Sequence, residues 1–435
     1  MQKRRLIFRG FEISLVLLTL LLALVGFGRI LPTLLRVPDS YDFAAYYVAG
    51  RTLNVSGNVY DAAQMAQAAN RPGDAVAFPR YIYPPFFAAL MRPLASFSFA
   101  TAKTLWFILN AGLLIAAIAL LARMAGMRWW VTLIFGGVVM LMPPIYDTFL
   151  LGQVNFVLLF LLTLMIYFST RSSPNRVTDM LAGVLLGIAA VIKIYPLLLG
   201  GVYLLHRRWN VLVGVILGIG LTLVVGVLGS GNTAMTVEYF TVVAPNLSGG
   251  GPGITDQSIW PVIARLFSVN QYRYAYLTPT NLVDLTLNPV VNAPWLGTAI
   301  TILLTLLILV VTARTFIRSR AAGTPLDLWF DLSIGITLIM LLFPVVHDHY
   351  FTLLLIPFAY VLNRYRTFLA THWFFRIGLT SAILCLVLQR YWRVILNSIP
   401  SPLVLISGFT GALILWLILL WLARTSTSLP SETQG

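Results

Sequence analysis

Apolar runs fill most of the chain and alternate with short polar or basic connections. The first run covers about residues 11–30, and the second covers residues 99–122. Runs of about 20 apolar residues can cross the roughly 30 Å hydrocarbon core of a bilayer as α-helices. Further spans are expected near residues 129–142, 154–168, 177–192, 196–205, 211–228, 291–313, 326–343, 351–362, 374–388 and 403–422. The pattern predicts an all-α, polytopic membrane protein with about 12 transmembrane helices.

Basic residues lie at alternate ends of these spans. Lys3, Arg4, Arg5 and Arg9 precede the first run, whose length and lack of a clear cleavage site favour a retained helix over a signal peptide. Arginines recur in the connections after the even-numbered spans, as is typical of cytoplasmic loops. We therefore expect both termini in the cytoplasm, with outer loops at residues 32–98 and 230–290. One membrane-embedded domain is expected over residues 1–425, followed by a short cytoplasmic tail at residues 426–435.

Three outer segments have a local pattern of their own. Glycine, asparagine and proline divide the loop 32–98 into short pieces, which we expect to form interfacial helices on the outer face. The segment 81–93 contains Pro84 and Pro85, which can open a helix at little cost, and it is too short to cross a bilayer. Four glycines and a proline at residues 249–253 predict a mobile lid.

Composition excludes several classes of protein. Hydrophobic residues make up 59% of the 435 residues, charged residues make up 10%, and the mean hydropathy is +0.88, so a soluble domain is excluded. The net charge is +15, but the basic residues are scattered at the ends of spans. This distribution indicates membrane orientation and contact with anionic lipid, and no nucleic acid. Cys385 is the single cysteine, which excludes an intramolecular disulfide and a cysteine-rich metal site.

Two carboxylates follow the first apolar run directly. Asp39 and Asp42 stand out in a chain with only 14 acidic residues. From Asp42 onward, Ala45, Tyr46 and Ala49 follow at helical spacing, which predicts a short helix on the membrane with Asp42 near its amino end. The two carboxylates could cap this helix, or they could serve a chemical role. The residues alone leave both interpretations open.

The remaining polar residues also fall on the outer side of the predicted topology. Gln153 and Asn155 could join helices by hydrogen bonds. Lys193 could extend to the interface, but its place beside a proline-marked break favours an anion ligand. His347 and His349 could form a helix-end pair, bind a phosphate oxygen or assist proton transfer. We expect no metal, because no third ligand with suitable spacing follows them.

A carboxylate, a lysine and histidines at an outer membrane surface fit one kind of chemistry. Glycosyl transfer from a lipid-phosphate sugar needs a base for the acceptor hydroxyl and positive charge for the departing phosphate. The bilayer itself would deliver the hydrocarbon tail of the donor. The competing class is transport, but transporters tend to show paired inverted halves, and no second copy of the Asp42 or Tyr83 segment is evident.

Six short motifs in order carry a family resemblance. They are Asp42-Phe43-x-x-Tyr46 with Gly50, Tyr83-Pro84-Pro85 followed by Pro93-Leu94, Gly152-Gln153-x-Asn155, Lys193-x-Tyr195-Pro196, Asp256-Gln257-Ser258 with Arg265, and Pro344 ahead of His347 to His349. Together they resemble the polyprenol-phosphate-mannose-dependent mannosyltransferases of the glycosyltransferase C superfamily, which include the mycobacterial enzymes that extend phosphatidylinositol mannosides. The resemblance covers the chain from the first helix to about residue 357. Asp256 is a departure, because relatives often have Asn there.

The resemblance implies an inverting transfer at the extracytoplasmic face, without a nucleotide donor and without metal or another cofactor. Asp42 matches the general base of the family, and the neighbouring Asp39 is the alternative carboxylate. We expect Lys193 and one of His347 or His349 to bind the donor phosphate, with Arg265 as a helper. The residues expected to contact sugar or acceptor are Asp39, Tyr46, Tyr83, Gln153, Asn155 and Gln257.

The sequence thus predicts a membrane-embedded catalytic domain in the plasma membrane that moves a sugar, mannose by resemblance, from a polyprenyl-phosphate donor to a glycolipid or glycan acceptor. We expect a monomer whose other partner is the lipid bilayer. A lipid-linked sugar flippase or a small-solute transporter is the alternative.

Overall fold

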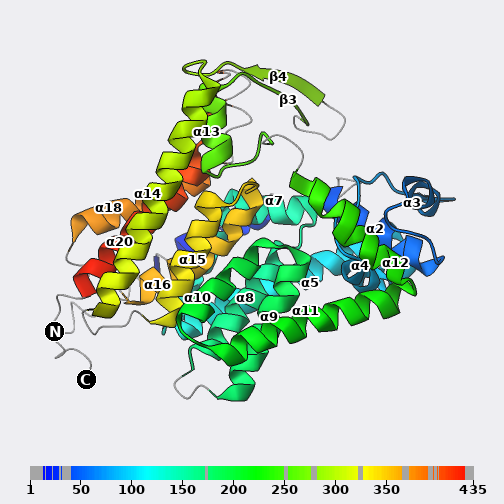
Figure 1. Cartoon of the computed structure of the whole chain (residues 1–435), viewed down its shortest axis with the longest axis horizontal. Helices are drawn as coiled ribbons and strands as arrows, with labels where there is room; N and C mark the ends of the chain where they lie inside the picture. Colours follow the sequence, from blue (N-terminus) through cyan, green and yellow to red (C-terminus); the bar gives the residue numbers. More distant parts are fainter. Residues whose placement is uncertain are drawn as a thin grey trace. The chain divides into compact units, whose positions relative to one another are not determined.

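A computed structural model describes residues 13–14, 16–21, 23–28, 31, 41–171, 175–248, 253–275, 282–321, 327–364, 372–389, 395, 399 and 401–426. Contacts divide the chain into two compact units, residues 1–249 and residues 250–435. Both units are mainly helical (Figure 1). The predicted all-α membrane class is therefore confirmed, whereas the single domain over residues 1–425 stays a prediction.

Helices and short helical turns make up most of the first unit. Its elements are α2 (Tyr41–Asn54), α3 (Ala62–Ala69), β1 (Asn70–Arg71), β2 (Asp74–Ala75), α4 (Pro85–Met91), η1 (Leu94–Ser96), α5 (Phe99–Met124), α6 (Trp129–Leu141), α7 (Pro143–Leu151), α8 (Asn155–Ser169), α9 (Arg176–Ile192), η2 (Tyr195–Leu199), α10 (Gly200–Leu205), α11 (Trp209–Ser230), α12 (Thr233–Glu238), η3 (Tyr239–Val243) and η4 (Pro245–Ser248). The strands β1 and β2 form one short antiparallel pair. Among the η elements of this unit, η3 is a π-helix and the others are 3-10 helices.

The second unit combines helices with one β-hairpin. Its elements are α13 (Ile259–Phe267), β3 (Asn270–Ala275), β4 (Leu282–Leu287), α14 (Pro294–Ala321), α15 (Leu328–Leu342), η5 (Asp348–Leu354), α16 (Leu355–Arg364), α18 (Trp373–Leu388), η7 (Pro402–Leu405) and α20 (Ser407–Ser426). Strands β3 and β4 pair antiparallel, with Asn270 opposite Leu287. Helices α18 and α20 pack side by side within this unit (Figure 1).

Four helices among the described residues are long and apolar enough to cross a membrane by themselves. They are Phe99–Met124, Trp209–Ser230, Pro294–Arg318 and Ser407–Arg424. A fifth span is possible if α6 and α7, which meet at an angle of 63°, cross together. The other apolar helices are shorter, so the expected total of about 12 stays a prediction.

Proline explains two places where the structure departs from the predicted spans. The run expected at residues 129–142 ends at Leu141, and Pro143 then opens the separate helix α7, because proline is favoured at the first helical position. The span expected at residues 196–205 starts as the 3-10 helix η2, with Pro196 in its first turn. The second break leaves Lys193 at the end of α9.

The outer loops contain more structure than the sequence pattern predicts. The described part of loop 230–290 folds into α12, η3, η4, α13 and the β3–β4 hairpin. Residues 249–252 of the predicted lid lie outside the described residues. In the first outer loop, Pro85 opens α4, which has seven residues and is too short to span the bilayer.

Helices α9 and α11 pack closely along their lengths (Figure 1). Gly183 and Gly187 of α9 face Gly214 and Gly218 of α11, and a Cβ atom at any of these positions would collide with the backbone of the partner helix. Small residues spaced four apart allow this close approach in membrane proteins. The contact fixes the end of α9, where Lys193 follows.

Candidate active site

The helix α2 presents Asp42 at its amino end. Asp42 lies in the first turn, where a carboxylate is favoured by the helix dipole. Residues 43–53 are buried, whereas Asp42 keeps partial exposure. Asp39 lies outside the described residues, so its expected role stays a prediction. The geometry therefore places a partly exposed carboxylate next to the buried stretch 43–53 of α2.

One turn along α2, the hydroxyl of Tyr46 enters a polar network. It lies 3.0 Å from the hydroxyl of Tyr83 and 3.2 Å from Gln153 Oε1. The Tyr83 hydroxyl is 3.4 Å from the same Gln153 oxygen. Tyr60 donates a hydrogen bond to the backbone carbonyl of Tyr83 over 2.8 Å, which helps to fix this ring. The hydroxyls of Tyr46 and Tyr83, from two separate segments, thus both lie beside the amide oxygen of Gln153.

The sharp turn between α7 and α8 positions Gln153 and Asn155. Gly152 ends α7 with φ +66°, a left-handed conformation that favours glycine. The indole N–H of Trp106 donates to the Gly152 carbonyl over 2.7 Å, and the Asn155 amide donates to Thr148 Oγ1 over 3.3 Å. The turn is therefore fixed from both sides.

Lys193 completes this network from the end of α9. It lies in the connection between α9 and η2, outside both helices. Its ammonium donates to Asn155 Oδ1 over 3.1 Å and reaches Gln153 Oε1 at 3.5 Å. Burial lowers the pKa of Lys193 from 10.5 to about 7, while the negative charge of Asp42 acts in the opposite direction and raises it. Asp42 and Lys193 therefore interact electrostatically within the first unit.

A second polar cluster lies within the second unit. His347 Nδ1 is 2.7 Å from Asp256 Oδ1, and the two residues also form a backbone bridge. The His347 side chain is 35% exposed, whereas the Asp256 side chain is 2% exposed. His349 is only 7% exposed and packs its ring against Tyr350. Of the two histidines in the sequence prediction, His347 is the more accessible one.

Arg265 and Gln257 lie in the interior of the second unit. Arg265 is fully buried and donates hydrogen bonds to the backbone carbonyls of Gly253, Asp256 and Leu405. Gln257 donates to Asp348 Oδ1 over 2.6 Å and accepts from the Gly408 amide over 2.6 Å. These contacts support the segment that carries Asp256. The substrate contacts expected for Arg265 and Gln257 stay predictions.

The sequence interpretation missed a further ion pair that supports α2. Arg51 donates to Asp74 Oδ2 over 2.7 Å, and Tyr47 contacts the same oxygen at 3.1 Å. The Asp74 carboxylate also accepts from the backbone amide of Phe99, at the start of α5. No sequence motif signals this contact, because Asp74 comes from a hairpin with no strong local pattern. The ion pair ties α2 to the start of α5.

A metal site would need several His, Cys, Asp or Glu side chains around one point. Within the described ranges, no group of three or more His, Cys, Asp or Glu side chains converges on a common point. The expectation of metal-independent chemistry stays a prediction.

A family comparison identifies the class of protein. Residues 81–344 match the model of glycosyltransferase family 87, and the chain belongs to this family. The matched region includes Tyr83, Gln153, Asn155 and Lys193. The protein is therefore a membrane glycosyltransferase, as the sequence predicts at this level. No curated protein sequence matches the chain.

Two solved structures are similar to the chain over most of its length. One is the crystal structure of ArnT from Cupriavidus metallidurans bound to undecaprenyl phosphate, with 12% identity, a TM-score of 0.40, and coverage of 96% of this chain and 78% of that chain. The other is ArnT from Cupriavidus metallidurans in the apo state, with 13% identity, a TM-score of 0.34, and coverage of 96% and 77%. Similarity at this level says nothing about the substrates of the present chain.

Proposed function

We propose that this protein transfers a sugar, mannose in the first instance, from a polyprenyl-phosphate donor to a hydroxyl of a glycolipid or glycan acceptor. The observation that carries the proposal is the polar network in which the Lys193 ammonium contacts the Gln153 and Asn155 side-chain oxygens while the negative charge of Asp42 acts on it. A base and a cation close together supply the two charges that this reaction requires. The donor class rests on the resemblance of the sequence motifs and on the membrane-embedded fold.

Each residue has a defined role in the proposed inverting reaction. The acceptor oxygen forms a bond to the anomeric carbon while the bond from that carbon to the phosphate oxygen breaks. Asp42 takes the proton of the acceptor hydroxyl. Lys193 binds the donor phosphate and stabilises the polyprenyl phosphate that leaves. Gln153 and Asn155 orient Lys193, and their amide groups contact sugar hydroxyls.

Tyr46 and Tyr83 hold Gln153 in place in this proposal. Their hydroxyls lie at 3.2 Å and 3.4 Å from its Oε1 atom. In the second unit, we assign the further phosphate contact to His347 and not to His349, because its ring is more exposed and Asp256 orients it. An imidazole can bind a phosphate oxygen or exchange a proton near neutral pH. Neither role needs a metal or another cofactor.

The proposed location is the plasma membrane, with both termini in the cytoplasm and the active site on the extracytoplasmic side. The support is the excess of arginine in the connections after the even-numbered predicted spans. We propose a monomer, because the residues that form the polar network all belong to one chain. Membership of a glycosyltransferase family favours transfer over the flippase and small-solute transporter alternatives.

The test uses purified protein in proteoliposomes with radiolabelled polyprenyl-phosphate mannose and a mixed glycolipid acceptor fraction. Release of polyprenyl phosphate together with a labelled glycolipid is the expected result. Labelled polyprenyl-phosphate glucose in a parallel reaction tests the choice of sugar. Movement of intact donor across the bilayer, without release of polyprenyl phosphate, would contradict the proposal and support a flippase.

A further inference from the structure

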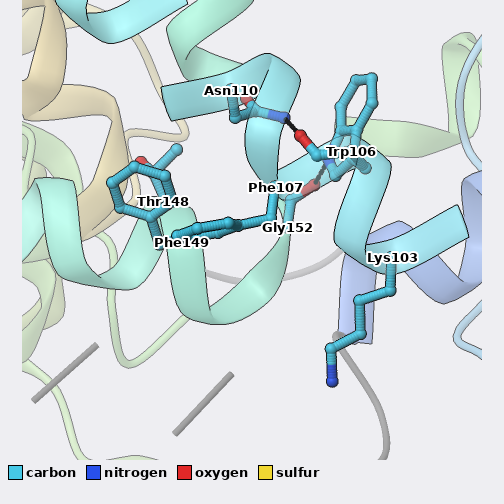
Figure 2. A pocket seen from close by; sticks show the side chains of 7 residues that line it. All are labelled: Lys103, Trp106, Phe107, Asn110, Thr148, Phe149 and Gly152. Atoms are coloured by element: carbon cyan, nitrogen blue, oxygen red, sulfur yellow. Dashed lines mark hydrogen bonds between the residues drawn. The ribbon is translucent and has the colours of Figure 1, made fainter. Parts of the chain in front are cut away.

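Trp106 of α5 lies between the helix that carries Asp42 and the turn that carries Gln153. Figure 2 shows its indole ring and the hydrogen bond from the ring N–H to the Gly152 carbonyl. Trp106 is only 3% exposed, so its ring is enclosed by protein. None of the six sequence motifs includes Trp106, and its place between the two parts of the site comes from the structure alone.

The indole ring packs against α2. It stacks on Phe43 with 5.8 Å between ring centroids and an angle of 19° between the ring planes. It also meets the ring of Tyr46 at 6.2 Å and 75°. Aromatic rings attract one another in both arrangements when their centroids lie about 4.5–7 Å apart. Phe43 directly follows Asp42 in the chain, so the ring of Trp106 fixes the part of α2 that carries the proposed base.

The indole N–H holds the turn between α7 and α8. It donates to the Gly152 carbonyl over 2.7 Å. The amides of Gly152 and Gln153 donate to the carbonyls of Phe149 and Thr148, so the other side of the turn is closed by the backbone. The Gly152 carbonyl and the Gln153 nitrogen belong to one planar peptide group. A hydrogen bond to this carbonyl therefore fixes the direction in which the Gln153 side chain leaves the backbone.

Helix α5 is attached to α2 at two points. At its start, the Phe99 amide donates to the carboxylate of Asp74, which also accepts from Arg51 of α2. Trp106 follows Phe99 by seven residues, or about 10 Å along the helix axis, and makes the second attachment. Two separated attachments hold α5 against α2. The indole N–H is thus a fixed reference point for the turn that it contacts.

We propose that Trp106 is a positioning residue for sugar transfer, which sets the place of the Gln153 amide relative to the Asp42 carboxylate. This inference rests on the proposed function, in which Asp42 faces the acceptor hydroxyl and Gln153 contacts a hydroxyl of the donor sugar. The ring ties Trp106 to the base, and the N–H ties it to the amide. A misplacement of about 1 Å can lower a reaction rate by about 100-fold, so this alignment acts on the rate of transfer.

Two variants remove the N–H of Trp106 while keeping an aromatic ring beside α2. Trp106→Phe is the first, and incorporation of benzothienylalanine at position 106 is the second, because this residue keeps the shape of the indole and has sulfur in place of the N–H. The matched control is Trp416→Phe in the second unit. Trp416 is 5% exposed, and its indole N–H donates to Thr312 Oγ1 over 3.0 Å. The control therefore loses the same kind of buried hydrogen bond.

The values of kcat and KM are measured with polyprenyl-phosphate mannose, and kcat is expressed per site that binds labelled donor. We expect kcat to fall by about 10–100-fold in both variants at position 106. The KM for the donor should stay within about threefold of the wild type, because Lys193 keeps its contact with Asn155. Trp416→Phe should keep kcat within about twofold of the wild type. Equal losses of kcat in Trp106→Phe and Trp416→Phe would reduce the role of Trp106 to general stability.

A Gln153→Ala background tests whether Trp106 acts through Gln153. With the amide removed, Trp106→Phe should lower kcat by less than about twofold further, because the group that it positions is absent. An undiminished loss of kcat in this background would overturn the proposal.

Hydrogen–deuterium exchange separates failure of this inference from failure of the proposed function. Local opening of the turn speeds the exchange of its amides. In peptides that cover residues 148–155, exchange should be faster in both variants at position 106 than in the wild type and in Trp416→Phe. Unchanged exchange would overturn the positioning role and leave the transferase proposal intact. Faster exchange in a protein that transfers no sugar would support the contact and contradict the proposed function instead.

Discussion

The ammonium of Lys193 donates a hydrogen bond to Asn155 Oδ1 across 3.1 Å, joining the end of α9 to the start of α8. Both residues lie beside a break in the helical structure. The negative charge of Asp42, which lies in the first turn of α2, acts on the same ammonium and raises its pKa. Three separate helices therefore place their ends around one group of polar side chains, which is the arrangement that the proposed chemistry uses.

The charge of Lys193 should make donor binding depend on pH. Burial lowers its pKa to about 7 in the protein without donor. The phosphodiester of the donor is anionic throughout this range and binds the protonated lysine, so affinity should be highest below pH 7 and should fall as the pH rises above it. Because donor binding is linked to a single proton, the affinity should fall by at most about tenfold per pH unit. Binding of labelled donor between pH 6 and 9 measures this slope.

Lys193→Arg and Lys193→Ala are the matched variants for that measurement. Arginine stays protonated over the whole range, so its donor affinity should vary little with pH. Alanine should bind the donor weakly at every pH. If wild-type and Lys193→Ala proteins bind the donor equally well, Lys193 has no role as a phosphate ligand.

The hydroxyls around Gln153 should act as a unit. Tyr46→Phe and Tyr83→Phe each remove a hydroxyl close to Gln153 Oε1 and close to each other. A hydrogen bond of this kind contributes about 1 kcal/mol, so each variant should lose about fivefold in kcat/KM for the donor. The loss of kcat/KM in the double variant should be smaller than the product of the two single-variant losses, because both changes disrupt the same network. Fully multiplicative losses would show that the two hydroxyls act independently.

Asp256 should affect the reaction through His347. Asp256→Asn removes the negative charge 2.7 Å from His347 Nδ1, so the imidazole keeps only the Thr255 hydroxyl, 3.1 Å from the same nitrogen, as a partner at that atom. We expect donor affinity to fall by about tenfold, because a hydrogen bond to a charged group contributes about 1.5–3 kcal/mol and only part of it acts through the orientation of the ring. Asp284→Asn, on the exposed part of β4, is the control and should bind like the wild type. In a His347→Ala background, Asp256→Asn should have little further effect, and an undiminished effect would assign Asp256 a different role.

The sequence predicts some of these contacts and misses others for identifiable reasons. The spacing of Asp42 and Tyr46 predicts their place on one helix, because the relation is local. The pairing of Asp256 with His347 could not be predicted, since it joins segments far apart in the chain through a backbone bridge. The burial of Arg265 could not be predicted either, because its partners are backbone carbonyls that have no signature in the sequence.

The close packing of α9 and α11 gives a prediction on stability. Gly183→Ala would place a Cβ atom against the backbone of α11, and overpacking typically costs about 1–3 kcal/mol. Gly220→Ala, on α11 with no neighbouring atom near the added Cβ, is the control. We expect a lower midpoint of thermal unfolding in detergent for Gly183→Ala and an unchanged or higher one for Gly220→Ala. Equal midpoints would show that the two helices can separate without cost.

Asp42→Asn tests the central claim most directly, in a single-turnover reaction with labelled polyprenyl-phosphate mannose and excess acceptor. The amide keeps the size of the side chain and removes its ability to accept the acceptor proton. The account predicts a rate of sugar transfer that falls by about 10²–10⁴-fold, while donor binding and thermal stability stay close to the wild type. A transfer rate near that of the wild type would contradict the assignment of Asp42 as the base and the mechanism built on it.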